Sequence, residues 1–225
     1  MAVAQTYILK PPQQLLSTFG QTNIHYYLLT EPVYSELEPQ APPETVLREG
    51  HVIAERPKLV TPLYMQRLEG FGADAQRYFQ MMAQRHGDHA PGLLYTYKNE
   101  PKELTILADA LPTVAERISA EVISRAEPRT AIIRGLDEMW DVSLFKFIYE
   151  LTERSLSNNV FELQQRGLMG VDNRGLPNEA RMRIEHMFWQ VRRDELDPSV
   201  LKTELDRWDL FEDYQDRFFD LIRQR

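Results

Sequence analysis

The sequence predicts an α+β fold, in which a small N-terminal β meander and a mixed sheet pack against a predominantly helical C-terminal half. Three observations support this prediction. Short runs of β-branched and aromatic residues, broken by turn-forming residues, dominate the first 60 positions. Helix start signals appear from Thr61 onward, and beyond Asp137 the sequence indicates only helices and loops. We therefore divide the chain into an α+β region, residues 1–135, and a helical region, residues 136–225, and keep open that both form one continuous domain.

The N-terminal region begins with extended segments. Residues 22–30 (TNIHYYLLT) form the clearest early strand, and residues 36–43 carry three prolines that predict an extended surface loop. Within residues 46–53 the Glu49-Gly50 pair predicts a tight hairpin turn. Residues 57–62, bracketed by prolines, predict another short extended piece. Together these segments predict a small antiparallel meander.

Helices and strands then alternate. Thr61-Pro62 combines a cap residue with proline at the first helical position, and a second helix is predicted from 73 to 86 before Gly87. Two short strands are expected at 93–97 and 103–107, separated by Asn99-Glu100-Pro101. Thr113 and Glu116 have the spacing of a capping box that opens a helix to about Arg125.

A crossover would bring carboxylates together. If the strands 103–107 and 130–133 are parallel members of one sheet, Asp109 and the pair Asp137-Glu138 follow their carboxyl ends, where open α/β sheets place their sites. Such carboxylates suit Mg²⁺ binding or acid–base catalysis, so an enzyme is one alternative function. The structural alternative is that Asp137 and Asp141 cap the next helix.

The helical region has unusually broad apolar faces. A helix over residues 142–156 has an apolar arc of about 220°, which predicts a central core helix. The last 48 residues predict a helical hairpin, with one helix from Pro177 to Asp194 and a second from Pro198 to Ile222. On the first of these, Met182, His186, Trp189 and Arg193 share a face that is separate from the core stripe.

The last predicted helix carries an apolar arc beside a charged stripe. The arc includes four aromatic residues that could anchor a partner, namely Trp208, Phe211, Phe218 and Phe219. Five aspartates at spacings of three and four form the stripe, namely Asp206, Asp209, Asp213, Asp216 and Asp220. Either these faces dock a partner protein or a second copy, or they are core, with Arg181, Arg183, Arg192 and Arg193 pairing with the stripe across the hairpin.

Other motifs give weaker signals. His86, Asp88 and His89 are three metal-ligand types within four positions, but they follow a helix end where such residues are common. The Gly70-Phe-Gly72 spacing resembles a dinucleotide fingerprint only by chance, because a helix rather than a strand precedes it. Phosphate-binding loops, Gly-x-Ser-x-Gly elbows and His-Glu-x-x-His are absent. We expect no cofactor and no metal.

The composition narrows the function classes further. The 225 residues include no cysteine, which excludes disulfides and thiolate metal sites. The net charge of −8 is spread without a basic segment, so nucleic-acid binding is only a further alternative, based on the arginines from Arg181 to Arg193. No apolar stretch approaches the ~20 residues that span a bilayer, and the first ten residues do not resemble a signal peptide. The leading hypothesis is a non-catalytic, cytoplasmic interaction or regulatory protein that uses its C-terminal hairpin.

Overall fold

The structure is a computed structural model that describes residues 2–36, 41–68, 70, 72–172 and 175–223. It shows an α+β fold in two compact units, each built from two separate stretches of chain. Unit 1 comprises residues 1–56 and 95–159, and unit 2 comprises residues 57–94 and 160–225. The division predicted at residue 135 falls inside unit 1. The predicted proline loop at 36–43 lies largely outside the described residues.

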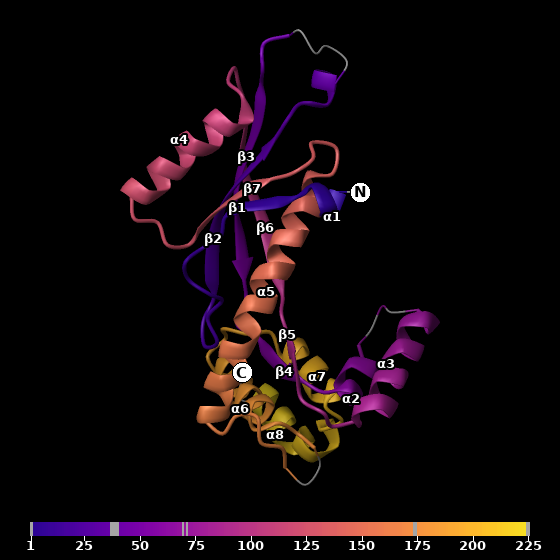
Figure 1. The fold of residues 1–225 in the computed structure, drawn as a ribbon. Helices are drawn as coiled ribbons and strands as arrows, with labels where there is room; N and C mark the ends of the chain where they lie inside the picture. The colour runs from indigo at the N-terminus through magenta and orange to yellow at the C-terminus, as the bar shows by residue number, and fades with distance from the viewer. Residues whose placement is uncertain (1, 37–40, 69, 71, 173–174, 224–225) are drawn as a thin grey trace. The chain divides into compact units, whose positions relative to one another are not determined.

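The elements follow one another along the chain as Figure 1 shows. Unit 1 holds α1 (Ala2–Gln5), β1 (Tyr7–Lys10), β2 (Thr22–Thr30), η1 (Val33–Glu36), β3 (Thr45–Ala54), β6 (Tyr97–Leu107), α4 (Leu111–Ser124), β7 (Thr130–Arg134) and most of α5 (Trp140–Gln165). Unit 2 holds β4 (Lys58–Val60), α2 (Pro62–Gln66), α3 (Ala73–His86), β5 (Gly92–Leu94), α6 (Asn178–Arg192), α7 (Pro198–Arg207), α8 (Phe211–Arg223) and the end of α5.

A mixed five-stranded sheet forms the centre of unit 1, in the order β1-β7-β2-β3-β6. β2 pairs with β7 in parallel, whereas β1 with β7, β2 with β3 and β3 with β6 are antiparallel. It follows that β6 runs in the same direction as β2 and β7. The predicted crossover therefore does join two parallel strands, β6 and β7, but these are not neighbours, because β2 and β3 lie between them.

The two faces of the sheet are covered by different helices, α4 and α5 (Figure 1). Successive side chains of a strand point to opposite faces, so β2 contributes to two separate clusters and is buried along nearly its whole length. One cluster joins Ile24, Tyr26 and Leu28 to Leu144, Phe147 and Leu151 of α5. The other joins Tyr27 and Leu29 to Val114, Ile118 and Val122 of α4.

The hairpin turn predicted at Glu49-Gly50 is wrong, because β3 runs through both residues without a turn. Gly50 is required for packing instead. A Cβ atom at this position would lie 2.5 Å from the Tyr26 hydroxyl and 2.8 Å from the backbone oxygen of Glu100. The break predicted at Asn99-Glu100-Pro101 is also wrong, because β6 runs without interruption from Tyr97 to Leu107, while residues 93–94 of the first predicted strand belong to β5. The ladder of β6 with β3 shifts its register next to Gly50. Gly50 therefore leaves room for the Tyr26 side chain to pack against the backbone of β3, and it does not reverse the direction of the chain.

Two helix predictions also need correction. α4 begins at Leu111, with Ala110 before it making no side-chain cap, so Thr113 and Glu116 lie inside the first turns and form no capping box. α5 is longer than predicted, and only part of its apolar arc is core. The inward residues of the predicted arc are buried on the sheet, but three of its large apolar residues point to solvent, namely Phe145, Tyr149 and Leu156.

The start signals read in unit 2 are confirmed. Thr61 accepts a hydrogen bond from the backbone of Tyr64 and Pro62 follows it, while Asp197 accepts one from the backbone of Ser199. The helix at 73–86 has the predicted bounds. The single last helix is wrong, however, because α7 ends at Arg207 and α8 begins at Phe211, with Asp209 at φ +59° between them.

A buried ion-pair network lies in the core of unit 2. Arg183 on α6 contacts Glu204 at 2.7 Å and Glu179 at 2.6 Å; both carboxylates are buried and the Arg183 side chain is 12% exposed. The Glu204 carboxylate also accepts hydrogen bonds from the Tyr64 hydroxyl and from Trp208 Nε1, each at 3.1 Å. Burial alone would raise the pKa of Glu204, but Arg183 and these donors hold it below its ordinary value. The network joins α2, α6 and α7.

Glu204→Gln is expected to destabilise unit 2 by about 2–4 kcal/mol, less than the cost of fully stranding a buried charge, because Glu179 still faces Arg183. Since the folded pKa of Glu204 is depressed, its contribution is present above about pH 4.5 and is lost as the pH falls below that value. Urea unfolding at pH 7 and pH 4 measures both effects. An equal loss of stability on acidification in variant and wild type would contradict the assignment.

Gly50→Ala is expected to cost on the order of 1–3 kcal/mol, because the added methyl group meets a ring and a backbone oxygen that cannot both retreat. Gly92→Ala is the matched control, since this strand glycine has only one atom, at 4.0 Å, near its virtual Cβ. Thermal unfolding of the two variants compares them. Similar melting temperatures for both would show that the Tyr26 ring moves aside without cost.

Candidate functional site

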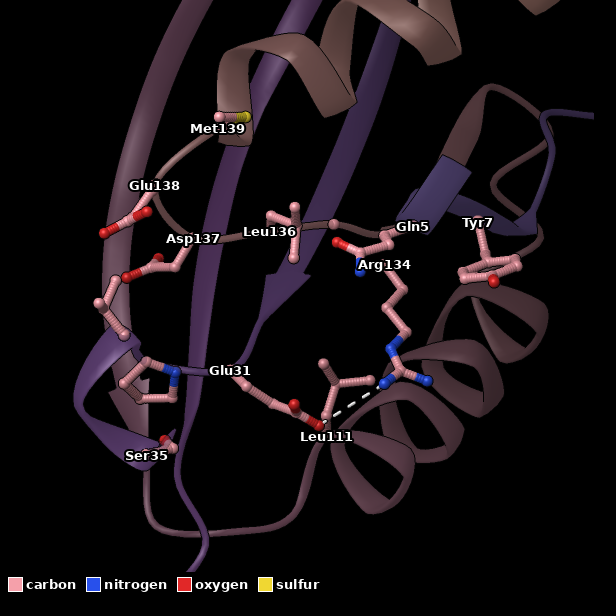
Figure 2. A pocket seen from close by; sticks show the side chains of 13 residues that line it. Gln5, Tyr7, Glu31, Ser35, Leu111, Arg134, Leu136, Asp137, Glu138 and Met139 are labelled. Carbon is pink, nitrogen blue, oxygen red and sulfur yellow. Dashed lines mark ion pairs between the residues drawn. The ribbon is translucent and has the colours of Figure 1, made fainter. Parts of the chain in front are cut away.

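A polar pocket of about 750 Å³ lies at the edge of unit 1 where β2 and β7 end. Figure 2 shows its lining side chains, which come from the loops after β2 and β7, from the chain start and from the beginning of α4. Arg134 crosses the pocket to Glu31, 3.7 Å away. Asp137 and Glu138 also line it, so the sequence correctly placed these two residues beyond the carboxyl end of a sheet strand.

Asp137 is held by structural contacts rather than being available for chemistry. Its carboxylate lies 2.7 Å from the Arg48 guanidinium and accepts a hydrogen bond from Thr30 at 2.8 Å. Arg48 in turn lies over the ring of Trp140, 5.7 Å from its centre. The expectation that Asp137 caps the following helix is therefore wrong. Asp141 is not its N-cap either, because α5 begins at Trp140; the Asp141 carboxylate accepts a bond from the adjacent amide of Val142 within the first turn.

Asp109 follows β6, and it shares the edge with Asp137 without meeting it in one site. Its carboxylate pairs with Arg117 on α4 at 3.0 Å, and its backbone oxygen accepts a hydrogen bond from Thr45. It does not line the pocket. Asp109, Asp137 and Glu138 thus form no common catalytic or metal-binding group. The edge instead uses arginine–carboxylate pairs to join the loops to the sheet.

Asp137→Asn is expected to destabilise unit 1 by about 1.5–3 kcal/mol, because it removes a charge-assisted contact to a largely buried Arg48. Glu138→Gln, in the same loop, is the control and should leave stability within about 0.5 kcal/mol. Chemical denaturation measures both. Equal stability of the two variants would remove the structural role assigned to Asp137.

The face predicted on α6 is exposed along its whole length. Met182 is 61% exposed and Trp189 45%, and both His186 and Arg193 are exposed as well. The His186 and Trp189 rings stack with centroids 5.5 Å apart. The Arg193 guanidinium lies 4.5 Å from the centre of the Trp189 ring. These four residues, termed the α6 face below, form one continuous aromatic and cationic surface.

The apolar arc predicted on the last helix is mostly core. Trp208 is only 9% exposed, its ring lies tilted against Tyr64 with centroids 4.6 Å apart, and its Nε1 donates a hydrogen bond to Glu204. Phe218 is buried, and Phe211 is half-buried against it. Phe219 alone is exposed among the four predicted aromatic anchors, and it makes edge contacts to its two phenylalanine neighbours. The break after Arg207 turns this arc into the core of unit 2.

The five aspartates do not form a single stripe. Asp206 belongs to α7 and pairs with Lys202, Asp209 lies in the turn and pairs with Arg67, and only the other three lie on α8. The pairing predicted from α6 to this stripe is also wrong, because Arg181, Arg183 and Arg193 contact Asp172, Glu204 and Glu195 respectively. The helices are joined in the opposite sense, by Arg217 on α8 and Glu185 on α6.

The weak metal candidate, His86 with Asp88 and His89, has contacts of other kinds in the structure. The His89 ring lies against Gly175, where a Cβ atom would be 2.0 Å from its Nδ1, and the backbone oxygen of Asp88 accepts a bond from Leu63. His86 ends α3 as expected. Among the described residues, no group of three or more histidine, aspartate or glutamate side chains has the geometry to hold a metal ion.

Sequence reasoning missed a histidine cluster on the sheet face that α4 shares. His25 and His51 are opposite one another on β2 and β3, with rings stacked at 5.0 Å. His25 lies 2.9 Å from Glu49 and 3.8 Å from Glu127. Burial and the nearby Lys102 lower the pKa of His51. In the sequence, the alternation of the strand 22–30 puts His25 on the same face as Tyr27, which was the one available signal. Only the strand register shows that His51 and Glu49 are its neighbours.

No known protein family matches the chain, and neither a curated protein nor a solved structure is significantly similar to it. The site must therefore be interpreted from its own chemistry. Within the part of the chain that the structure describes, no helix is both long enough and apolar enough to cross a membrane.

Proposed function

We propose that this protein binds another protein through the α6 face, and that its function is interaction or regulation rather than catalysis. The observation that carries the proposal is the exposure of Trp189 together with Met182, on a helix whose other side is anchored in a core. Tryptophan, methionine and arginine are enriched at protein interfaces, where aromatic residues often supply most of the binding energy. A cytoplasmic setting remains part of this proposal.

The α6 face is organised before any partner arrives. His186 stacks on one side of the tryptophan and Arg193 lies over its ring, which restricts the rotamers of these side chains. Ile184, Phe188 and Val191 on the opposite side of α6 are buried in the core of unit 2 and fix the helix. A surface that is already ordered loses less conformational entropy on binding.

The two alternative functions have less support. Two of the three carboxylates of the enzyme alternative have arginine partners, Asp137 with Arg48 and Asp109 with Arg117. For the nucleic-acid alternative, three of the arginines that would contact phosphates are paired with carboxylates, Arg181 with Asp172, Arg183 with Glu204 and Arg193 with Glu195. Phosphate binding would have to break such pairs before it gained from counterion release.

Trp189→Ala is expected to weaken partner binding by about tenfold to a hundredfold, because a well-placed interface tryptophan contributes more than ~1.4 kcal/mol. Tyr78→Ala is the matched control, since Tyr78 is an exposed aromatic residue on α3 of the same unit. Tagged wild type and variants are compared by quantitative capture from the source cells, followed by titration of the captured protein. Both variants should unfold at the wild-type temperature. Unchanged capture by Trp189→Ala would refute the proposal.

A further inference from the structure

One edge of the sheet in unit 1 is open. β6 is the last strand in the order β1-β7-β2-β3-β6, and no strand of the described residues pairs with its outer side. The helix α4 packs mainly on β2 and β7, and on β6 the cluster that includes α4 reaches Leu107. A strand edge exposes a row of backbone donors and acceptors that another strand can pair with, so natural sheets usually protect it.

The two halves of β6 differ in this protection. Its first half carries Lys98, Pro101 and Lys102, and the register shift of the ladder falls there. Proline, lysine and bulges are the features that keep edges from pairing. The second half, Glu103–Leu107, has no such feature beyond Glu103. Instead it exposes Leu104 to 58% and Ile106 to 53%, on the same face of the sheet.

We propose that two copies of this chain pair antiparallel through Glu103–Leu107 of β6, so that their sheets become continuous. The second copy is favoured over an unrelated strand because this segment is complementary to itself. In an antiparallel ladder, opposite residues have the same hydrogen-bonding state, which alternates along each strand. A strand pairing with its own copy must therefore have its two-fold axis at a residue and not between two residues.

The charge pattern selects the residue on the axis. An axis at Lys102 or Glu103 would place like charges directly opposite each other, which is destabilising. An axis at Leu104 would place the aliphatic side chain of Ile106 opposite the charged side chain of Lys102, which is not a stabilising cross-strand pair. An axis at Thr105 places Leu104 opposite Ile106 of the second copy, twice, and Glu103 opposite Leu107, with no charge opposite a like charge. Unlike the axis at Leu104, it pairs both exposed aliphatic residues with aliphatic residues. The two exposed aliphatic residues then form cross-strand pairs of the kind that stabilise sheets.

The ends of this pairing bring no like charges together. With the axis at Thr105, Lys102 of each copy lies opposite Ala108 of the other, and the nearby charges are paired within their own chain, Lys102 with Glu49 and Asp109 with Arg117. Beyond this segment Pro101 prevents the ladder from extending. A five-residue pairing is short, so we expect a weak dimer whose population depends on protein concentration.

Single cysteines test the axis directly, because the native chain has none. In either hydrogen-bonding state, the two Thr105 Cα atoms would be about 4.5–5.5 Å apart, within the range of a disulfide. Thr105→Cys should therefore give a covalent dimer on mild oxidation. Lys98→Cys, at a position more exposed than Thr105 but about 48 Å from its counterpart at ~3.4 Å per residue, should not. A monomeric Thr105→Cys chain under conditions that cross-link Lys98→Cys would overturn the proposal.

Charge on the edge gives the second test. Leu104→Lys with Ile106→Lys should abolish the concentration-dependent dimer in sedimentation velocity and the Thr105→Cys disulfide. Ile123→Lys, at a 67% exposed position on α4, should change neither. Because the substituted residues are exposed, all variants should keep the wild-type melting temperature. A wild type that stays monomeric at every concentration, or a dimer that survives both lysines, would contradict the pairing. Trp189→Ala should leave this dimer intact, which separates the proposal from the α6 face.

Discussion

The pairing of β3 with two partners is the interaction on which unit 1 depends. β3 lies between β2, from the preceding part of the chain, and β6, which follows only after the chain has contributed residues 57–94 to unit 2. Its ladder with β6 starts where Ala54 meets Tyr97, so it closes a long excursion of the chain. Bringing the two ends of this segment together costs conformational entropy, which grows slowly with the number of residues in the loop. The ten paired positions of the β3–β6 ladder offset this cost. At Gly50 both partner strands come close to β3, because a side chain there would meet the Tyr26 ring of β2 and the Glu100 backbone oxygen of β6.

Charged residues in this protein mainly hold elements together. Arg48 with Asp137 joins β3 to the loop after β7, and Arg183 with Glu204 joins α6 to α7. Each of these two arginines has a carboxylate within hydrogen-bonding distance, and the planar guanidinium suits such fixed contacts. This use of charge explains why residue types that look catalytic in the sequence have structural partners. The acidic excess of the chain therefore identifies no catalytic site.

The two surfaces proposed for binding are those whose side chains have no such role. The α6 face is ordered by contacts among its own members, with Arg193 over Trp189, and no strand of the described residues pairs with the outer side of β6 along Glu103–Leu107. One offers aromatic side chains and the other a backbone edge. They belong to different units and would bind by different physical means, so each can be tested while the other is intact.

The sequence alone determined the local features, because these depend on neighbouring residues. It predicted the α+β class, the strand at 22–30, the helix at 73–86 and the caps at Thr61 and Asp197. Tertiary structure decided everything that depends on distant partners. The Tyr26 ring fills the space where a side chain at position 50 would lie, and Arg48 forms an ion pair with Asp137. The helix break at Asp209 places Trp208 in the core. Periodicity counts apolar positions, but only packing decides which of them meet solvent, and so Phe145 is exposed while Phe218 is buried.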